Sequence, residues 1–385
     1  MARARTLAED LGRHDVIVVG GGIAGVSRAG ELAAGARVLL REREAQPATH
    51  ASGRSAAVSV EPLSTDAVLA LTRATTPFLA APPEDFTAEP LVSDRGFLLL
   101  ASPAAAGEVD AFLDAWQPRC PQLREIDEAD ARRRVPVLRA GCTARCVLDP
   151  TALALDTNEM LQGWLRRLRA GGGQLVTGAG VTAVDREENE FRVTTTAGTA
   201  RAPVLVNAAG AWASGLAALA GAAAIELIPH RRSAALVAPP GGADVSAWPM
   251  VCALDESFYF KPEGTQLMLS PADETPVAPM DAWPEDIDLA VAVERIQAVA
   301  DLPVRRFTAS WAGLRTFSPD RNPVFGWDAE LPGFYWCAGQ GGAGFQTSAG
   351  AARWCAAEIG VGAPPEALTE HGFRRGDVSP SRFAG

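Results

Sequence analysis

Histidine, tyrosine and paired cysteine are scarce in this sequence. The 385 residues include four histidines, two tyrosines and six cysteines, and no two cysteines form a CxxC pair. So few ligands argue against a metal site, and scattered cysteines argue against a disulfide framework. Cys142 and Cys146 lie closer together, but no second ligand pair is near them. They are therefore expected to be two buried thiols, with no metal bound.

Long apolar runs and an excess of positive charge are also missing. No unbroken apolar run reaches the ~18 residues of a membrane-spanning helix, so no integral membrane segment is expected. The formal net charge of −11 would repel nucleic acid and anionic membranes. Residues 1–15 carry charges of both signs without the apolar core of a secretion signal. These absences favour a cytoplasmic protein whose partner is a small molecule.

The N-terminal region carries the most specific pattern. A β-rich run covers residues 14–19, the GxGxxG sequence runs from Gly20 to Gly25, and an alanine-rich helix follows to about residue 34. A second strand, residues 37–40, ends just before Glu42, which lies 22 positions after Gly20. GxGxxG alone often marks only a turn. Here strand, helix, second strand and acid stand in the order of a dinucleotide-binding βαβ unit.

Each residue of this fingerprint has a physical task. Gly20 permits the tight turn, Gly22 lets the backbone approach a pyrophosphate, and Gly25 lets helix and strand pack closely. The first N–H groups of the helix then face the anion. Glu42 can accept the ribose hydroxyls, which favours FAD or NAD over NADP.

Later segments alternate between helix and strand. Asp156 to Glu159 fit a capping box, and the helix that it begins should end at Gly171. A mostly antiparallel body is expected between the parts of the nucleotide-binding body, because apolar positions alternate after Glu42 and again over residues 225–270. Strands are expected over residues 174–177, 191–195 and 204–207.

Three segments rich in small residues suit close contact with a cofactor, residues 52–57, 206–212 and 339–347. The last also reads GxGxxG. Only 41 residues follow Gly344, and they should hold one helix and a proline-rich tail instead of a second strand ending in an acid. This loop is therefore expected to point its N–H groups at a flavin ring and not at a second nucleotide.

Five motifs together resemble the D-amino-acid oxidase family of FAD enzymes, over about residues 14–373. They are GGGIAG with Glu42, HASGRSAA from His50, VNAAGAW, RTFSPDRNPVFG from Arg315, and GQGGAGFQTS from Gly339. Within that family, VPVL, PHRRSA, LDESFYFKP and WAGLR are most similar to bacterial D-arginine dehydrogenase.

The resemblance implies an α/β fold in which a Rossmann-like FAD-binding domain of the glutathione-reductase type is interleaved with an antiparallel-sheet substrate domain. Residues 14–75, 140–222 and 311–372 are expected in the first domain, and residues 76–139 and 223–310 in the second. FAD should be non-covalent, because RTFSPD holds no cysteine. The residues expected to bind it are Gly20, Gly22, Ile23, Ala24, Gly25, Glu42, Arg43, Ser52, Gly53, Arg54, Ser55, Ala56, Val181, Ala209, Gly210, Trp212, Gly313, Gly341, Gly342, Gly344, Phe345, Gln346 and Thr347.

The resemblance also implies the reaction. A hydride leaves Cα of an amino acid for flavin N5, and the resulting imine is hydrolysed to a 2-oxo acid and ammonia. Arg232, Tyr259 and Arg315 match the residues that hold the substrate carboxylate. Guanidinium groups suit this task, since each can donate two parallel bonds to a carboxylate. Because Arg231 precedes Arg232 on an expected strand, only one of the two can face inward. A surface arginine and a core tyrosine are the commoner fates of such residues.

Three departures bear on the substrate. Val58, Leu63 and Phe97 stand where the arginine-specific enzyme has histidine, tyrosine and glutamate. A cationic side chain would lose its partners there, so a D-amino acid with a neutral or apolar side chain is expected. Glu89 or Asp94 could supply a replacement acid if the loop shifted.

Two other functions stay open. The fold could oxidise an N-substituted amine, sarcosine-like or opine-like, or the chain could be a non-catalytic flavin binder. The retained arginines and tyrosine favour an enzyme. The electron acceptor is expected to be oxygen or a quinone.

Overall fold

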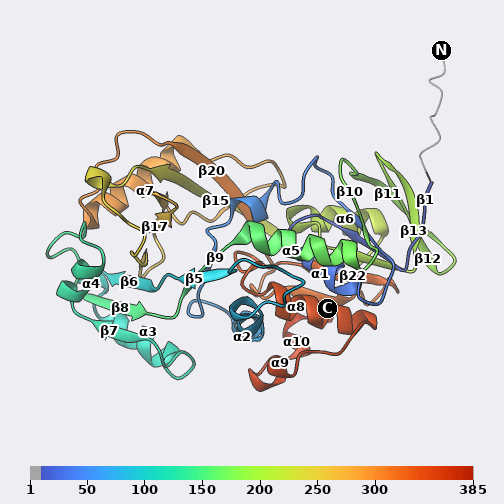
Figure 1. Cartoon of the computed structure of the whole chain (residues 1–385), viewed down its shortest axis with the longest axis horizontal. Helices are drawn as coiled ribbons and strands as arrows, with labels where there is room; N and C mark the ends of the chain where they lie inside the picture. The colour runs from blue at the N-terminus through green and yellow to red at the C-terminus, as the bar shows by residue number, and fades with distance from the viewer. Residues whose placement is uncertain (1–9, 385) are drawn as a thin grey trace, which may run out of the picture.

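A six-stranded, mainly parallel sheet carries the N-terminal fingerprint in the computed structural model, which describes residues 10–384 (Figure 1). Only its last strand runs antiparallel to its neighbour. In spatial order the strands are β10 (Gln174–Val176), β3 (Val38–Arg41), β2 (Val16–Val19), β14 (Val204–Asn207), β22 (Phe334–Ala338) and β21 (Val324–Trp327).

Both faces of this sheet are covered, which explains why β2 reads as the continuous apolar run VIVV. Val16 and Val18 belong to one core cluster, and Ile17 and Val19 to another. The first face is covered by α1 (Ile23–Leu32), α2 (Asp66–Ala80), α5 (Thr157–Ala170) and α8 (Ser348–Ile359). The second is covered by α6 (Ala213–Ala220) and a four-stranded sheet of β1 (Asp10–Arg13), β13 (Gly198–Ala202), β12 (Glu190–Thr195) and β11 (Val181–Glu187).

A nine-stranded sheet forms the other lobe of the molecule (Figure 1). All its pairings are antiparallel except that between β16 and β6, which confirms the expected mostly antiparallel body. The path is β19 (Thr275–Pro276), β15 (Ile228–Val237), β18 (Gln266–Ser270), β17 (Tyr259–Glu263), β16 (Met250–Ala253), β6 (Phe97–Ala101), β8 (Arg145–Asp149) and β7 (Arg124–Ile126), with β20 (Ala309–Phe317) paired to β15.

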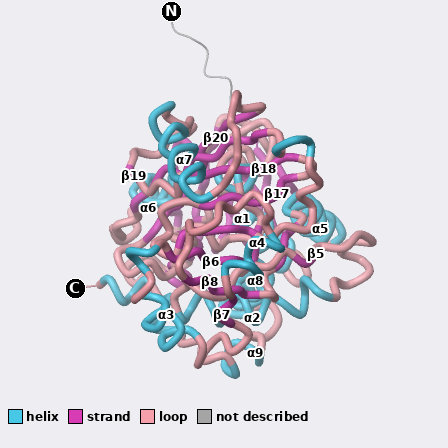
Figure 2. The backbone as a smooth tube through the Cα atoms, turned by 90° about the vertical axis from the view of Figure 1, so that its left-hand side faces the viewer, coloured by secondary structure: helices cyan, strands magenta, loops and turns pink. Residues whose placement is uncertain are grey.

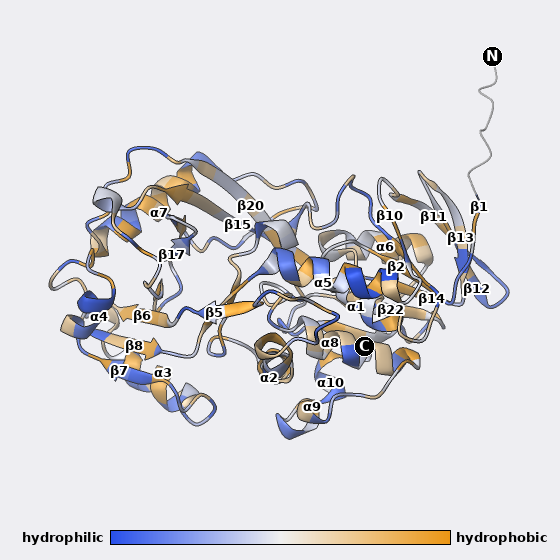
Figure 3. Ribbon diagram, viewed as in Figure 1, coloured by the Kyte–Doolittle hydropathy of each residue, from blue (hydrophilic) through white to orange (hydrophobic). Residues whose placement is uncertain are grey.

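The two faces of this sheet bury different clusters. Strand β6 is hydrophobic along its whole length in Figure 3, and its residues alternate between the clusters. Leu98 and Leu100 face one cluster, with α4 (Glu128–Arg134) and α7 (Asp286–Val299). Phe97 and Leu99 face the other, with α3 (Glu108–Trp116). A small sheet of β4 (Val58–Ser59), β9 (Leu153–Leu155) and β5 (Val92–Asp94) lies between the lobes (Figure 1). In the turned view of Figure 2 the lobe of the nine-stranded sheet faces the viewer.

Several local predictions are confirmed. The Asp156 side chain accepts a hydrogen bond from the Glu159 N–H at 2.8 Å, and α5 ends at Gly171. The three expected strands are β10, β12 and β14. The α/β fold class is confirmed as well, because a mainly parallel sheet with helices on its face stands beside a mostly antiparallel sheet.

Two expectations need correction in detail. The described residues after Gly344 contain no strand, but two short helices, α9 (Glu366–Glu370) and α10 (Arg375–Val378), follow α8 where only one helix was expected. Cys146 is buried and Cys142 only half-buried. Neither detail was visible in the hydrophobic pattern, because short helices and loop thiols depend on tertiary contacts.

The division into domains stays a proposal. Strand β8 and all but the first two residues of β20 lie inside ranges expected for the FAD-binding domain, yet both strands pair within the nine-stranded sheet. We propose that the boundaries fall after each of these strands, near residues 150 and 318. None of the helices within residues 10–384 is long and apolar enough to cross a membrane.

Candidate active site

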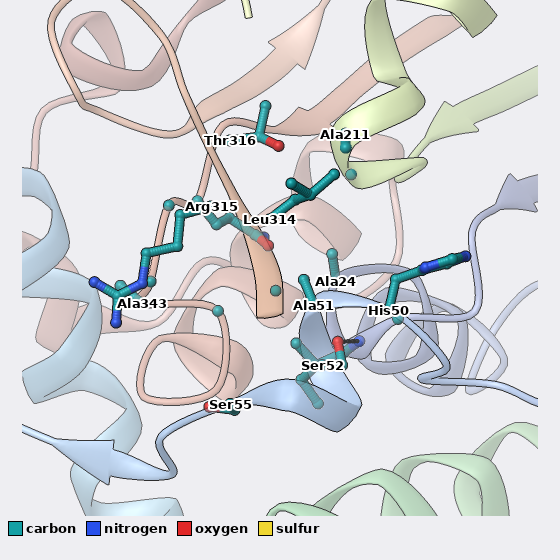
Figure 4. Close-up of a pocket in the computed structure, with 18 of the residues that line it drawn as sticks. Ala24, His50, Ala51, Ser52, Ser55, Ala211, Leu314, Arg315, Thr316 and Ala343 are labelled. Atoms are coloured by element: carbon teal, nitrogen blue, oxygen red, sulfur yellow. Dashed lines mark hydrogen bonds between the residues drawn. The ribbon is translucent and has the colours of Figure 1, made fainter. Parts of the chain in front are cut away.

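One cavity of about 890 Å³ runs from the GxGxxG turn to the nine-stranded sheet. Its wall includes the ends of β2 and β3, the segment before β4, the loop after β14, and the glycine loop before α8. Figure 4 shows part of this wall, with side chains converging from segments far apart in sequence. Such a long cavity between two sheets can hold an extended cofactor and a small substrate together.

The glycine turn is built for close approach at its first residue. Gly20 has φ +117°, and a Cβ there would lie 2.2 Å from the Ala208 carbonyl oxygen. A Cβ on Gly25 would lie 1.8 Å from the Gly20 oxygen, so this glycine serves helix packing and does not line the cavity. The turn brings the N-terminus of α1 to the cavity wall.

This N-terminus offers backbone donors to an anion. The Ile23 N–H donates to Ser52 Oγ at 2.9 Å, the dashed line in Figure 4. Gly22 is the N-cap, and it has no side chain to cap the helix. Unpaired N–H groups and the helix dipole favour a pyrophosphate here.

Glu42 is held at the end of β3 by two backbone donors. Its Oε2 accepts from the Gly21 N–H at 2.6 Å, and its Oε1 from the Glu44 N–H at 2.8 Å. Each carboxylate oxygen has a second acceptor position, so the group can still accept ribose hydroxyls. The side chain lines the cavity although the residue is only 7% exposed.

Flat side chains gather beside Glu42. The Arg43 guanidinium lies 4.6 Å from the centre of the Trp212 ring, and the His50 ring lies 4.7 Å from it. All three line the cavity, as does Val181. This end of the cavity suits a flat aromatic base. His50 was not predicted as a wall residue, because its position in a loop gave no periodic signal.

Strand register explains how the two arginines meet at the other end. Arg232 on β15 lies opposite Gly313 on β20, and His230 opposite Arg315. Because side chains alternate along a strand, Arg232, Gly313 and Arg315 share one sheet face. Both arginines line the cavity.

Arg315 has no partner in the described structure. Within residues 10–384 its guanidinium makes neither a hydrogen bond nor an ion pair, and Figure 4 shows its side chain extended beside Ala343. A Cβ on Gly342 would lie 3.0 Å from Arg315 Cζ, so the glycine loop touches the guanidinium. Burial, with repulsion from Arg232, lowers the pKa of Arg315 to about 10. A half-buried guanidinium without a partner favours an incoming anion.

Arg232 differs because it is already paired. Its Nε donates to the Asp273 carbonyl at 2.7 Å, and its Nη2 to Glu274 at 2.9 Å. Arg231 lies on the opposite face, where it pairs with Glu285 and Asp288. The alternation expected from sequence therefore separates the two adjacent arginines.

Tyr259 lies on the same cavity face. Its partner on β18 is Ser270, whose strand pairs with β15, and Tyr259 is 4% exposed. Its hydroxyl makes no hydrogen bond among the described residues, and its side chain lines the cavity, as that of Arg315 does. The phenol is thus placed to donate to a ligand on Arg315.

An apolar wall completes the substrate end. Val58, Leu63 and Phe97 all line the cavity, and Met250 and Met268 join them. The two methionines were missed because their facing depends on the register of β16 and β18. Glu89 and Asp94, the acids considered as replacements from the sequence, do not line the cavity. At this end its wall instead includes Glu256 and Glu274.

Most residues expected at the cofactor line this cavity, and three do not: Gly25, Gly53 and Thr347. Thr347 instead donates from its hydroxyl to the Ala343 carbonyl at 2.8 Å, just before α8. The lining residues not discussed above include Ala24, Arg54, Ser55, Ala56, Ala209, Gly210, Gly341, Gly344, Phe345 and Gln346. Their cofactor contacts stay a prediction.

The fold and this cavity define a dinucleotide-binding protein whose cavity carries arginine side chains at its other end. The chain belongs to the DAO family of FAD dependent oxidoreductases, whose pattern matches residues 15–358. FAD is therefore its cofactor, and the glycine turn, the free helix N-terminus and Glu42 fit that group.

The curated relatives of this chain carry the names of different enzymes. The chain is 26% identical to mouse mitochondrial sarcosine dehydrogenase over 54% of its own length and 24% of that protein. It is 28% identical to hydrogen cyanide synthase subunit HcnC of Pseudomonas aeruginosa, over 59% of this chain and 54% of that one. The matched region thus spans only part of these curated relatives.

Solved structures share the fold almost throughout. Glycine oxidase from Geobacillus kaustophilus superposes with a TM-score of 0.80 at 21% identity, covering 94% of this chain and 99% of that one. L-proline dehydrogenase from P. horikoshii gives 0.78 at 21% identity, with coverages of 94% and 99%. At such identities the likeness shows the fold, and the substrate has to be argued from the cavity.

Proposed function

We propose that this protein oxidises D-amino acids with neutral or apolar side chains to imino acids, which water converts to 2-oxo acids and ammonia. FAD-dependent oxidation of an amine or amino acid follows from the family. The preference for the D-form rests on the motif resemblance to D-arginine dehydrogenase. The side-chain preference rests on the cavity wall.

One observation carries the proposal: the partnerless Arg315 guanidinium faces the cavity beside a wall of apolar side chains. A zwitterionic amino acid needs a cation for its carboxylate and space for its side chain. Arg315 supplies the first, and Phe97, Leu63 and Met250 line the second. A fully paired arginine would have favoured a purely structural role instead.

The residues of this chain would orient and shield the substrate. FAD, when bound, supplies the acceptor for the hydride that leaves Cα. Arg315 would bind the carboxylate with two parallel N–H donors, and the Tyr259 hydroxyl would donate to the same group. Holding the carboxylate at two points fixes Cα relative to the Gly342 loop. The apolar wall excludes water from the reacting carbon.

N-substituted amines form the second candidate class. A sarcosine dehydrogenase is among the relatives, and iminodiacetate oxidase from Chelativorans shares the fold at a TM-score of 0.74 and 21% identity. Such substrates also carry a carboxylate for Arg315. Oxygen or a quinone is proposed as the electron acceptor for either class.

Anaerobic mixing with substrate panels tests the proposal. Purified protein is mixed with D-amino acids, L-amino acids, sarcosine and iminodiacetate, and the visible absorbance of the flavin is followed. We expect neutral D-amino acids to bleach it fastest. Faster bleaching by sarcosine would favour the second class, and no bleaching by any amine would favour a non-catalytic flavin binder.

One FAD per chain should be released without a covalent bond. Two of the cysteines line the cavity, Cys252 and Cys337, and burial raises the pKa of both thiols, which disfavours the thiolate needed for attachment. Acid precipitation should therefore leave a colourless pellet and a yellow supernatant with equimolar flavin. Flavin on the denatured chain would contradict the prediction.

Carboxylate binding should weaken at high pH. The pKa of Arg315 is lowered to about 10, so its charge is present below that pH and is lost as the pH rises through it. The facing titratable groups are Arg232, Tyr259, Glu256 and Glu274. Butyrate, which has no amine, should bind to the oxidised protein at pH 8 and lose affinity as the pH passes about 10.

The flavin spectrum reports this binding, and Arg315→Lys is the matched control. A lysine has an ordinary pKa of ~10.4, which the same burial lowers further. Its variant should lose butyrate at a lower pH than the unaltered protein. Identical profiles for the two proteins would mean that another group binds the carboxylate.

A further inference from the structure

A bridging carboxylate lies beside the free arginine at the substrate end of the cavity. Glu274 Oε1 accepts from Arg232 Nη2 at 2.9 Å and from Arg321 Nη2 at 3.0 Å. Its Oε2 accepts from Arg321 Nη1 at 3.1 Å. All three residues line the cavity. One carboxylate thus occupies two of the guanidinium groups that face the substrate space.

The charges at this end leave one cation available. Burial raises the pKa of Glu274, but hydrogen bonds from Arg321 and the charges of the nearby arginines outweigh it, and the pKa is lowered overall. Glu274 is therefore ionised at neutral pH. Arg315 has no partner in the described part of the chain. Glu256 also lines the cavity, and its side chain forms no hydrogen bond within residues 10–384.

Arg232 and Arg315 are close enough to act together. They lie on one face of adjacent strands, with Gly313 opposite Arg232 and Arg315 two positions further along. Diagonal neighbours of this kind lie within reach of long side chains. The pKa of Arg315 is lowered partly by the charge of Arg232, which agrees with this placement. An Arg232 without Glu274 could meet a second carboxylate on a short ligand.

We propose that Glu274 is a specificity-determining residue that restricts the substrate to one carboxylate at this end of the cavity. It occupies Arg232, and its own negative charge repels a second carboxylate. Monocarboxylic amino acids are therefore accepted and dicarboxylic ones are rejected. This inference rests on the proposed function, in which Arg315 binds the substrate carboxylate.

The test compares two four-carbon probes, butyrate and succinate, with the FAD-loaded protein. Their Kd values are measured from the visible spectrum of the flavin for the unaltered protein and for Glu274→Gln. We expect the variant to shift the Kd ratio by about tenfold toward succinate, since a charge-assisted bond to Arg232 becomes available. Butyrate affinity should change less than about threefold, because a rim charge contributes little to a ligand held by Arg315.

Glu285→Gln is the matched control. It removes the same charge from an acid that pairs with Arg231, the neighbour of Arg232 on the opposite face of β15. The Kd ratio should not move in this variant. An equal shift in both variants would reflect net charge alone and would overturn the proposal.

Arg321→Gln gives a second measurement if Glu274→Gln loses its flavin. With Arg321 removed, Glu274 keeps its bond to Arg232 and is opposed by one cation fewer. Succinate should then bind more weakly relative to butyrate, and a shift toward succinate would overturn the proposal. An unchanged ratio in Glu274→Gln, with butyrate still bound, overturns this inference alone. No response to butyrate or to any amine in the unaltered protein overturns the proposed function with it.

Discussion

Replacing Arg315 with alanine should lower kcat/KM on the best amino-acid substrate by roughly 30-fold to several-thousand-fold, while FAD stays bound. The range corresponds to ~2–5 kcal/mol, the usual cost of removing one partner from a buried, hydrogen-bonded charge pair. The guanidinium forms no bond within the described residues, so its full donor capacity is open to the substrate. Steady-state kinetics with the flavin spectrum as a loading check measure the effect.

The same change should not destabilise the protein. A half-buried cation without a partner adds nothing to the stability of the fold, so its removal should leave Tm unchanged or raise it. Arg231→Ala is the informative contrast, because Arg231 pairs with Glu285 and Asp288 outside the cavity. That variant should lower Tm and retain most of kcat/KM. A near-normal kcat/KM in Arg315→Ala would show that the carboxylate binds elsewhere.

Arg232→Ala should have a smaller effect on kcat/KM than Arg315→Ala. Arg232 already donates to the Asp273 carbonyl and to Glu274, so less of its capacity is free. The motif resemblance gave both arginines the same role. Their different partners distinguish them, and a larger loss in Arg232→Ala would reverse the proposed order.

The nucleotide end of the site was predictable because its pattern is local. Gly20 takes a positive φ in the turn between β2 and α1, and Glu42 lies where the second strand ends. Both properties depend on residues close in sequence or on one βαβ unit. The cavity accordingly contains the GxGxxG turn, the acid and the glycine loop together.

The substrate end was predictable only in part. Alternation along β15 separates Arg231 from Arg232, but alternation alone does not tell which one faces the cavity, and only the motif resemblance pointed to Arg232. That choice depends on the pairing of β15 with β20, two strands separated by about 70 residues of chain. Met250 and Glu274 escaped notice for the same reason. The register between strands far apart in sequence decides which of their residues, and which residues of the adjoining loops, face the cavity.

Phe97 is expected to control the preference between apolar and basic substrates. It is 2% exposed on β6, at the cavity wall next to Met250 on the neighbouring strand. An unpaired charge in such a place loses several kcal/mol of hydration, whereas an apolar side chain gains about 25 cal/mol for each Å² it buries. D-methionine, D-leucine and D-phenylalanine should therefore exceed D-arginine and D-lysine in kcat/KM by at least about tenfold.

Phe97→Glu should shift this preference toward basic substrates, because a carboxylate at the wall would pair with their side-chain cation. Phe97→Gln is the matched control: it has nearly the same size and no charge. Activity toward D-arginine should rise in the glutamate variant only, and activity toward D-leucine should fall in both, since each places a polar group in the apolar wall. The flavin spectrum and Tm check that both variants remain folded.

The two acids outside the cavity complete the test. Glu89→Gln and Asp94→Asn should leave the preference unchanged, because neither side chain lines the cavity. A preference of the unaltered protein for D-arginine would contradict the argument from the wall. The acid that binds the guanidinium would then have to be Glu256 or Glu274, which do line the cavity. In that case Glu256→Gln or Glu274→Gln would abolish the preference for D-arginine, and Phe97→Glu would change it little.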